Sequence, residues 1–159
     1  MCQTTRFLVC AVLPFREQKA KIDMFTKETL KVKLENYFKK GKVYVWKETF
    51  VIIKAKKPSI NAFANIIDHN ETTVIIEQSK YNDEDVIEIE KDWKILTFDM
   101  ILPFGLVGFL AKISQLLADE KISIFAISTY STDHLLIREK DLTRAEEKLK
   151  DIGFIIEEK

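Results

Sequence analysis

The sequence predicts an α+β fold in which antiparallel sheets carry helices on one face. Its 159 residues suffice for one domain or two very small ones. Hydrophobic residues make up 47% and charged residues 31% of the chain, a balance that supports both a buried core and a polar surface. Toward the C-terminus, strand-period and helix-period patterns alternate over about 65 residues, which indicates both element types within one domain.

The most regular pattern begins with a predicted strand at residues 93–100 (WKILTFDM), where apolar side chains point to opposite faces. Pro103 and Gly105 then break the strand. An amphipathic helix of about three to four turns is predicted next, because its apolar residues recur at helical spacing opposite a polar stripe. These apolar positions are Leu106, Phe109, Leu110, Ile113, Leu116 and Leu117.

A hairpin is predicted after this helix. Residues 122–129 (ISIFAIST) are apolar on both faces and predict a strand that is buried from two sides. Residues 132–138 (TDHLLIR) predict the partner strand, joined to the first by a tight turn at Tyr130 and Ser131.

A last helix is expected to begin at Asp141 or Thr143, because Glu146 follows Thr143 at the spacing of a capping box. Gly153 is placed to end this helix before a strand at residues 154–157. The order strand, helix, strand, strand, helix, strand is that of the ferredoxin-like fold. One such unit leaves one sheet face open, so we expect a second unit of this chain, a second chain, or both to cover it.

The N-terminal half is less regular. Residues 26–40 have apolar residues at helical spacing and Gly41 as a stop, although Leu30, Val32 and Leu34 also alternate as in a strand. Strands are predicted downstream at residues 50–55, 64–67, 72–77 and 86–89, with a turn at 68–71. We therefore expect a basic, partly helical extension (1–45), an incomplete first module (46–90) and a second module (91–159).

The formal net charge is zero, but the charges are unevenly distributed. Residues 1–60 hold 14 Lys and Arg against 5 Asp and Glu, so this part carries +9 and the remainder −9. The basic part fits a nucleic-acid or membrane patch, or a face neutralised within the fold or a dimer, and we favour the second interpretation. Residues 39–47 (KKGKVYVWK) mix lysines with aromatics as RNA-binding sheets do, but an amphipathic strand with outward lysines is simpler.

Several function classes find little support in the sequence. The longest apolar stretch, residues 100–111, is too short to span a bilayer, and four glycines offer no phosphate-binding loop. His69 and His134 belong to no recognisable motif with Cys2 or Cys10, and no Cys or His pair has metal-ligand spacing. We therefore expect a reduced, cytoplasmic protein with no catalytic residue, metal, cofactor or membrane partner.

Two turns are the best candidates for a binding site: ILPFGLVG at residues 101–108 and STYSTD at 128–133. Gly105 and Gly108 leave free backbone N–H groups at a helix N-terminus, where the partial positive charge attracts a carboxylate. Asp133 offers a carboxylate to an ammonium group. With apolar walls between these ends, the site fits a free amino acid; alternatively, the glycines only permit the turn and Asp133 only braces the hairpin. The walls would come from Phe104, Leu106, Phe109 and Tyr130.

The same residues resemble the ACT domain family, in the subtype of CASTOR-like proteins and small bacterial proteins with paired ACT modules. The similarity covers roughly residues 50–157. Its most specific segment is SIFAISTYSTDHLL at residues 123–136, and ETTVIIEQ at 71–78 resembles the first module. The resemblance implies ferredoxin-like modules in tandem and regulatory, non-enzymatic binding of a small ligand, commonly an amino acid, between modules.

Carried over to this sequence, the resemblance implies ligand contacts from both turns of one module and from the start of the second strand of another. The implied residues are Pro103, Phe104, Gly105, Leu106, Val107, Gly108, Thr129, Tyr130 and Asp133, and then Ser123 and Ile124. Leu106 aligns with the acidic residue of arginine sensors, so an apolar or small polar amino acid is expected. Such sensors have four modules on one chain, whereas this chain has room for two, so the resemblance implies a homodimer. The regulatory role that it implies also calls for a regulated protein partner.

Two other functions remain compatible with the sequence. The basic N-terminal face, with Lys39, Lys40 and Lys42, fits a nucleic-acid-binding module. A ligand-free interaction scaffold would result if Phe104 and Tyr130 filled the pocket themselves.

Overall fold

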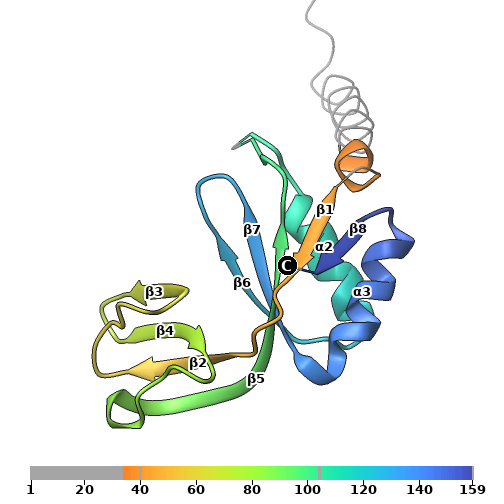
Figure 1. Cartoon of the computed structure of the whole chain (residues 1–159). Helices are drawn as coiled ribbons and strands as arrows, with labels where there is room; N and C mark the ends of the chain where they lie inside the picture. The colour runs from red at the N-terminus through yellow and green to blue at the C-terminus, as the bar shows by residue number, and fades with distance from the viewer. Residues whose placement is uncertain (1–33, 40, 104, 159) are drawn as a thin grey trace, which may run out of the picture.

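The computed structural model describes residues 34–39, 41–103 and 105–158. Residues 34–38 are helical, and a sheet of eight strands with two longer helices follows (Figure 1). In chain order the elements are β1 Lys42–Val45, β2 Phe50–Ala55, β3 Ala64–Ile67, β4 Thr72–Glu77, the 3-10 turn η1 Asp83–Asp85, β5 Val86–Phe98, α2 Phe109–Asp119, β6 Ile124–Ser128, β7 Asp133–Arg138, the 3-10 turn η2 Glu139–Asp141, α3 Leu142–Asp151 and β8 Ile155–Glu158.

Strand β5 belongs to both halves of the sheet and curves from one to the other (Figure 1). The strands predicted separately at 86–89 and 93–100 are thus one strand. Asp92 adopts the left-handed region (φ 62°) at the bend. The Gln78 side chain holds this residue, because its Nε2 donates to Asp92 Oδ1 (3.2 Å) and its Oε1 accepts from Asp92 N (3.0 Å).

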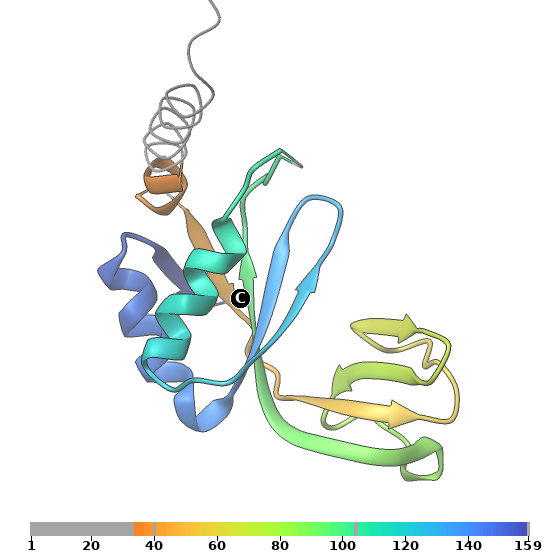
Figure 2. The ribbon, with the colours of Figure 1, turned by 180° about the vertical axis from the view of Figure 1, so that it is seen from behind.

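The second half-sheet contains the second part of β5 and has the strand order β6-β7-β5-β1-β8. Its elements β5, α2, β6, β7, α3 and β8 follow in the predicted ferredoxin-like order, with both helices on one face (Figures 1 and 2). Strand β1, which we expected in the N-terminal extension, lies between β5 and β8, antiparallel to β5 and parallel to β8. Its valines are buried and Lys42 is exposed, so the predicted amphipathic strand is confirmed.

The first half-sheet has the order β3-β4-β2-β5 and contains the first part of β5. If the four strands of each half are counted along the chain, leaving out β1, both half-sheets have the spatial order second, third, first, fourth. Loops at residues 56–63 and 78–85 occupy the places where the second half has helices. The two halves thus share a strand order and differ in their connections.

The core lies mainly between the second half-sheet and its helices, where Phe98, Ile113 and Leu149 are fully buried. Phe38 of the N-terminal helical turn adds to this core, with ring centroids 5.8 Å from Phe109 and 5.5 Å from Phe154. A further cluster covers the other sheet face, where the first half packs against the second through Phe50, Phe63, Trp93, Ile95 and Leu136. A unit of the same chain therefore covers part of the open face.

Two predictions from the sequence hold only in part. Residues 122–129 were predicted to form a strand covered on both faces, and this holds in part: Ile124 packs against the core under the helices, while Phe125 and Ile127 pack against the cluster on the other face. Among the described strands β6 pairs with β7 alone and lies at the sheet edge, so its burial is incomplete. Ala126 and Ser128 are exposed, and the other β6 residues are half-buried. Of the helix predicted at 26–40, residues 34–38 are helical; positions 26–33 and 40 lie outside the described residues. Within the described part of the chain, no helix has the length and hydropathy to cross a bilayer.

Candidate functional site

The two turns singled out in the sequence meet at one end of the second half-sheet (Figures 1 and 2). They are tied together by a backbone hydrogen bond from Leu102 N to Ser131 O (3.1 Å). Together with the first turn of α2, they line a pocket of about 300 Å³. The strand order dictates this meeting, because β5 and β7 are antiparallel neighbours and α2 starts where β5 ends.

Part of the expected ligand-binding set lines this pocket: Pro103, Leu106, Gly108, Thr129, Tyr130 and Asp133. Gly105 and the 63% exposed Val107 belong to the same loop but are absent from the lining. Ser123 and Ile124 lie at the opposite end of β6, far along the strand from its turn. Phe104 lies outside the described residues.

One end of the pocket is the N-terminus of α2. Gly108 is its N-cap with φ 87°, a left-handed conformation that glycine adopts without strain, and this residue has no side chain with which to cap the helix. The first backbone hydrogen bond of the helix runs from Lys112 N to Gly108 O (3.0 Å). The N–H groups of Phe109, Leu110 and Ala111, which precede Lys112 in α2, therefore have no acceptor within the helix and can hold an anion.

The hairpin turn supplies the other end. Asp133 is half-buried, and its carboxylate makes no hydrogen bond or ion pair with another described residue. Thr129 and Thr132 close the turn, because Thr129 N donates to Thr132 O and Thr129 Oγ1 donates to the same carbonyl, each at 2.9 Å. Apolar walls complete the pocket, from Leu102, Leu106, Phe109 and Leu110. The arrangement can hold a carboxylate, an ammonium group and an aliphatic side chain.

Several lining residues were missed as sequence candidates, above all Thr132. A usable signal was present, because Thr129 and Thr132 are three apart in a predicted turn, the spacing at which hydroxyl groups bond across a turn. Leu102, Leu110 and Ser131 carried no comparable signal, since their place in the lining depends on how the two loops pack.

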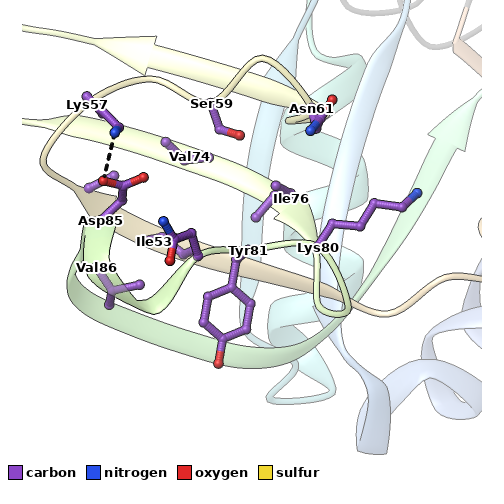
Figure 3. Close-up of a pocket in the computed structure, with 12 residues that line it drawn as sticks. Ile53, Lys57, Ser59, Asn61, Val74, Ile76, Lys80, Tyr81, Asp85 and Val86 are labelled. Carbon is purple, nitrogen blue, oxygen red and sulfur yellow. Dashed lines mark ion pairs between the residues drawn. The ribbon is translucent and has the colours of Figure 1, made fainter.

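A second pocket, of about 170 Å³, lies on the first half-sheet between the loops 56–63 and 78–85 (Figure 3). Its floor includes the buried side chains of Ile53, Val74 and Ile76. The charged groups at its rim are already paired, Lys57 with Asp85 (3.1 Å) and Lys80 with Glu77. This pocket therefore has no unpaired charge to select a zwitterion, and the pocket beside α2 is the better candidate.

The aromatic residues considered for RNA stacking do not form an open platform. Phe50 is buried, and Trp46 packs edge-on against it (centroids 5.9 Å apart) and against Phe63 (5.3 Å). Lys42 pairs with Glu157 at 2.8 Å. Stacking of bases requires accessible ring faces, so these observations count against a nucleic-acid site on β1 and β2.

Comparison with known proteins places this geometry in a familiar fold. Residues 88–151 match the family model of the ACT domain. The matched segment runs from within β5 to the end of α3 and so contains the candidate pocket. The match supports an ACT domain in this part of the chain.

Solved structures share the ACT-like fold over a larger part of the chain. Protein Atu0741 from Agobacterium tumefaciens has a TM-score of 0.66 at 18% identity, over 76% of this chain and 94% of that chain. VC0802 from Vibrio cholerae, of unknown function, gives 0.62 at 17%, over 76% and 96%. The ligand-free regulatory subunit of aspartate kinase from Thermus thermophilus gives 0.53 at 10%, over 70% and 96%. The predicted α+β fold class is confirmed.

Proposed function

We propose that this chain is a non-enzymatic regulatory protein that binds a free amino acid in the pocket between α2 and the β6–β7 turn. One observation carries the proposal: a helix N-terminus capped by a glycine and the carboxylate of Asp133, which no other described residue pairs with, line the same pocket. The ligand carboxylate would accept hydrogen bonds from the first N–H groups of α2. Its ammonium group would pair with Asp133.

The pocket favours an aliphatic side chain. Leu102, Leu106 and Leu110 line it. The charged side chain in its described lining is Asp133, which is assigned to the ligand's ammonium group, so no further charge is left for the ligand's side chain. Its volume of about 300 Å³ equals that of roughly ten water molecules, which suits an amino acid of the size of leucine. Likeness to a regulatory subunit of aspartate kinase supports a regulatory role.

A homodimer with paired ACT modules, as in the CASTOR-like subtype, is part of the proposal. Ser123 and Ile124 do not reach the pocket of their own chain, so a second copy would have to supply them. The exposed edge of β6, with its half-buried apolar residues, offers a surface for that copy. Ligand occupancy would alter contacts with a cytoplasmic protein partner.

A thermal-shift panel of the twenty amino acids tests the function. A ligand at one hundred times its dissociation constant stabilises the fold by about 2.7 kcal/mol, so aliphatic amino acids at millimolar concentration should raise the melting temperature. Asp133→Asn should abolish that rise, whereas Asp119→Asn, an exposed carboxylate at the other end of α2, should preserve it. No shift with any amino acid, or an undiminished shift in Asp133→Asn, would contradict the proposal.

A further inference from the structure

A chain of hydrogen bonds runs from the packing between the two halves to the candidate pocket. Trp46 Nε1 donates to Thr97 Oγ1 (3.0 Å), which lies 2.9 Å from His134 Nδ1. His134 Nε2 lies 3.4 Å from Thr132 Oγ1, which lies 3.0 Å from Thr129 Oγ1. Thr129 Oγ1 in turn donates to the carbonyl oxygen of Thr132 (2.9 Å). The long contact from His134 to Thr132 is the weakest link.

The ends of this chain determine its direction. An indole N–H only donates and a carbonyl oxygen only accepts, while each hydroxyl between them has one proton to give. The Thr97 hydroxyl accepts from Trp46, and the acceptor in reach of its own proton is His134 Nδ1. Every donor in the chain then has an acceptor if His134 carries its proton on Nε2 and donates it to the Thr132 hydroxyl. The Thr132 proton then points to Thr129.

The surroundings of His134 favour the neutral form of its ring. The residue is 8% exposed, and burial lowers its pKa, with Asp133 acting in the opposite direction. The elements packed around it present uncharged groups: Thr97 from β5, Ile127 from β6, and the ring of Phe63, whose centroid is 5.2 Å away. A neutral ring can accept at one nitrogen and donate at the other, as the chain requires.

We propose that His134 is a positioning residue that makes the hairpin end of the pocket select an ammonium group. His134 donates to the Thr132 hydroxyl and thereby directs the Thr132 proton to Thr129. A lone pair of the Thr132 oxygen then faces the pocket, which Thr132 lines beside Asp133. Without His134, the Thr132 hydroxyl can turn and donate to an anionic group instead. This inference rests on the proposed amino-acid function and adds a residue that does not itself line the pocket.

The tautomer can be measured without any ligand. Nitrogen chemical shifts of isotopically labelled protein at neutral pH should show His134 protonated at Nε2 alone. A proton on Nδ1, or a doubly protonated ring, would overturn the inference even if an amino acid binds. This measurement is independent of the proposed function.

Calorimetric titration with L-leucine and with 4-methylpentanoate, which lacks the ammonium group, tests the selectivity. Thr132→Val and His134→Asn should weaken leucine binding about tenfold or more and leave 4-methylpentanoate binding unchanged. Thr132→Ser and His134→Gln, whose amide N–H can replace Nε2–H, should restore leucine binding. Equal losses for both ligands would reduce His134 to a structural role and overturn the inference. Failure of leucine to bind the unmodified protein would contradict both the aliphatic amino-acid function and the selectivity.

Discussion

The two halves of the molecule share a strand order, but only the second half connects its strands through helices. In the first half, the loops satisfy their own polar groups: Asn82 Oδ1 accepts from Glu84 N, and Asn65 bonds the backbone of Ser59 twice. In the second half, the N-cap of α2 is Gly108, which has no side chain, and it lines a pocket together with Asp133, whose carboxylate is unpaired among the described residues. The strands therefore provide the scaffold, and the helical connection leaves backbone N–H groups that have no acceptor within the helix, which is where we propose that a ligand binds.

The largest expected effect is a loss of unfolding free energy when the core of either half is truncated, and this loss should differ between the two halves. Ile113→Ala, on the buried face of α2, should lower the free energy of unfolding by about 4 kcal/mol, because rigid elements surround the cavity. Ile76→Ala, under the loops, should cost about 2 kcal/mol, since loops can relax into the space. Urea denaturation measures both values. Equal losses, or a larger loss in Ile76→Ala, would contradict this explanation.

The next effect concerns the helix start. Gly108→Ala should destabilise the protein by about 1–2 kcal/mol, because φ of 87° is strained for any residue with a Cβ. Gly105→Ala is the matched control, since a Cβ there would meet no described atom within 4 Å and the described glycines with positive φ are Gly108 and Gly153. Thermal denaturation of the two variants makes the comparison. A loss in Gly105→Ala as large as in Gly108→Ala would refute this explanation.

A smaller effect is expected at the junction of the halves. Gln78→Ala removes both hydrogen bonds that hold Asp92 in its left-handed conformation and should cost about 1 kcal/mol. Asp92→Gly should offset part of this loss in the double variant, because glycine adopts that conformation without help. Urea denaturation of the single and double variants measures the coupling. Strictly additive losses would show that the Gln78 contacts do not stabilise the bend.

The smallest effect is a pH dependence from His134. Its pKa is lowered in the folded protein by burial, so the unfolded chain takes up the proton first as the pH falls. Stability should be complete above the ordinary histidine pKa of about 6.5 and decline as the pH falls from there toward the lowered value. His134→Gln should remove this part of the pH profile. The carboxylates of Asp68, Glu77 and Glu157, with lowered pKa values, act only in more acidic solution.

Most elements could be predicted from local patterns, and the errors arose where tertiary pairing decides the outcome. The apolar stripe from Leu106 to Leu117 and the hairpin turn at Tyr130 are local signals, and both elements form. The place of β1 between β5 and β8 has no local signal, because pairing partners lie far along the chain. The apolar run in β6 contacts both sheet faces as predicted, but it is only half-buried because β6 lies at a sheet edge, which no local pattern shows.

The site followed the same rule. Gly108 and Asp133 were identified from residue chemistry and spacing, and they line one pocket. Thr132 and Leu102 were missed, because their roles depend on the packing of two loops and on the contact to His134. Backbone geometry at a helix start is predictable from sequence, whereas the side-chain set around a pocket depends on the assembled fold.

Titration of isotopically labelled protein with L-leucine, followed by amide ¹H–¹⁵N spectra, tests the central claim most directly. We expect the N–H signals of Phe109 and Leu110, at the start of α2, and of Asp133 to shift together with one dissociation constant, while the signal of Tyr81 in the first-half pocket stays unchanged. Shifts confined to Tyr81 and its neighbours, or spectra without any change at millimolar leucine, would contradict the claim.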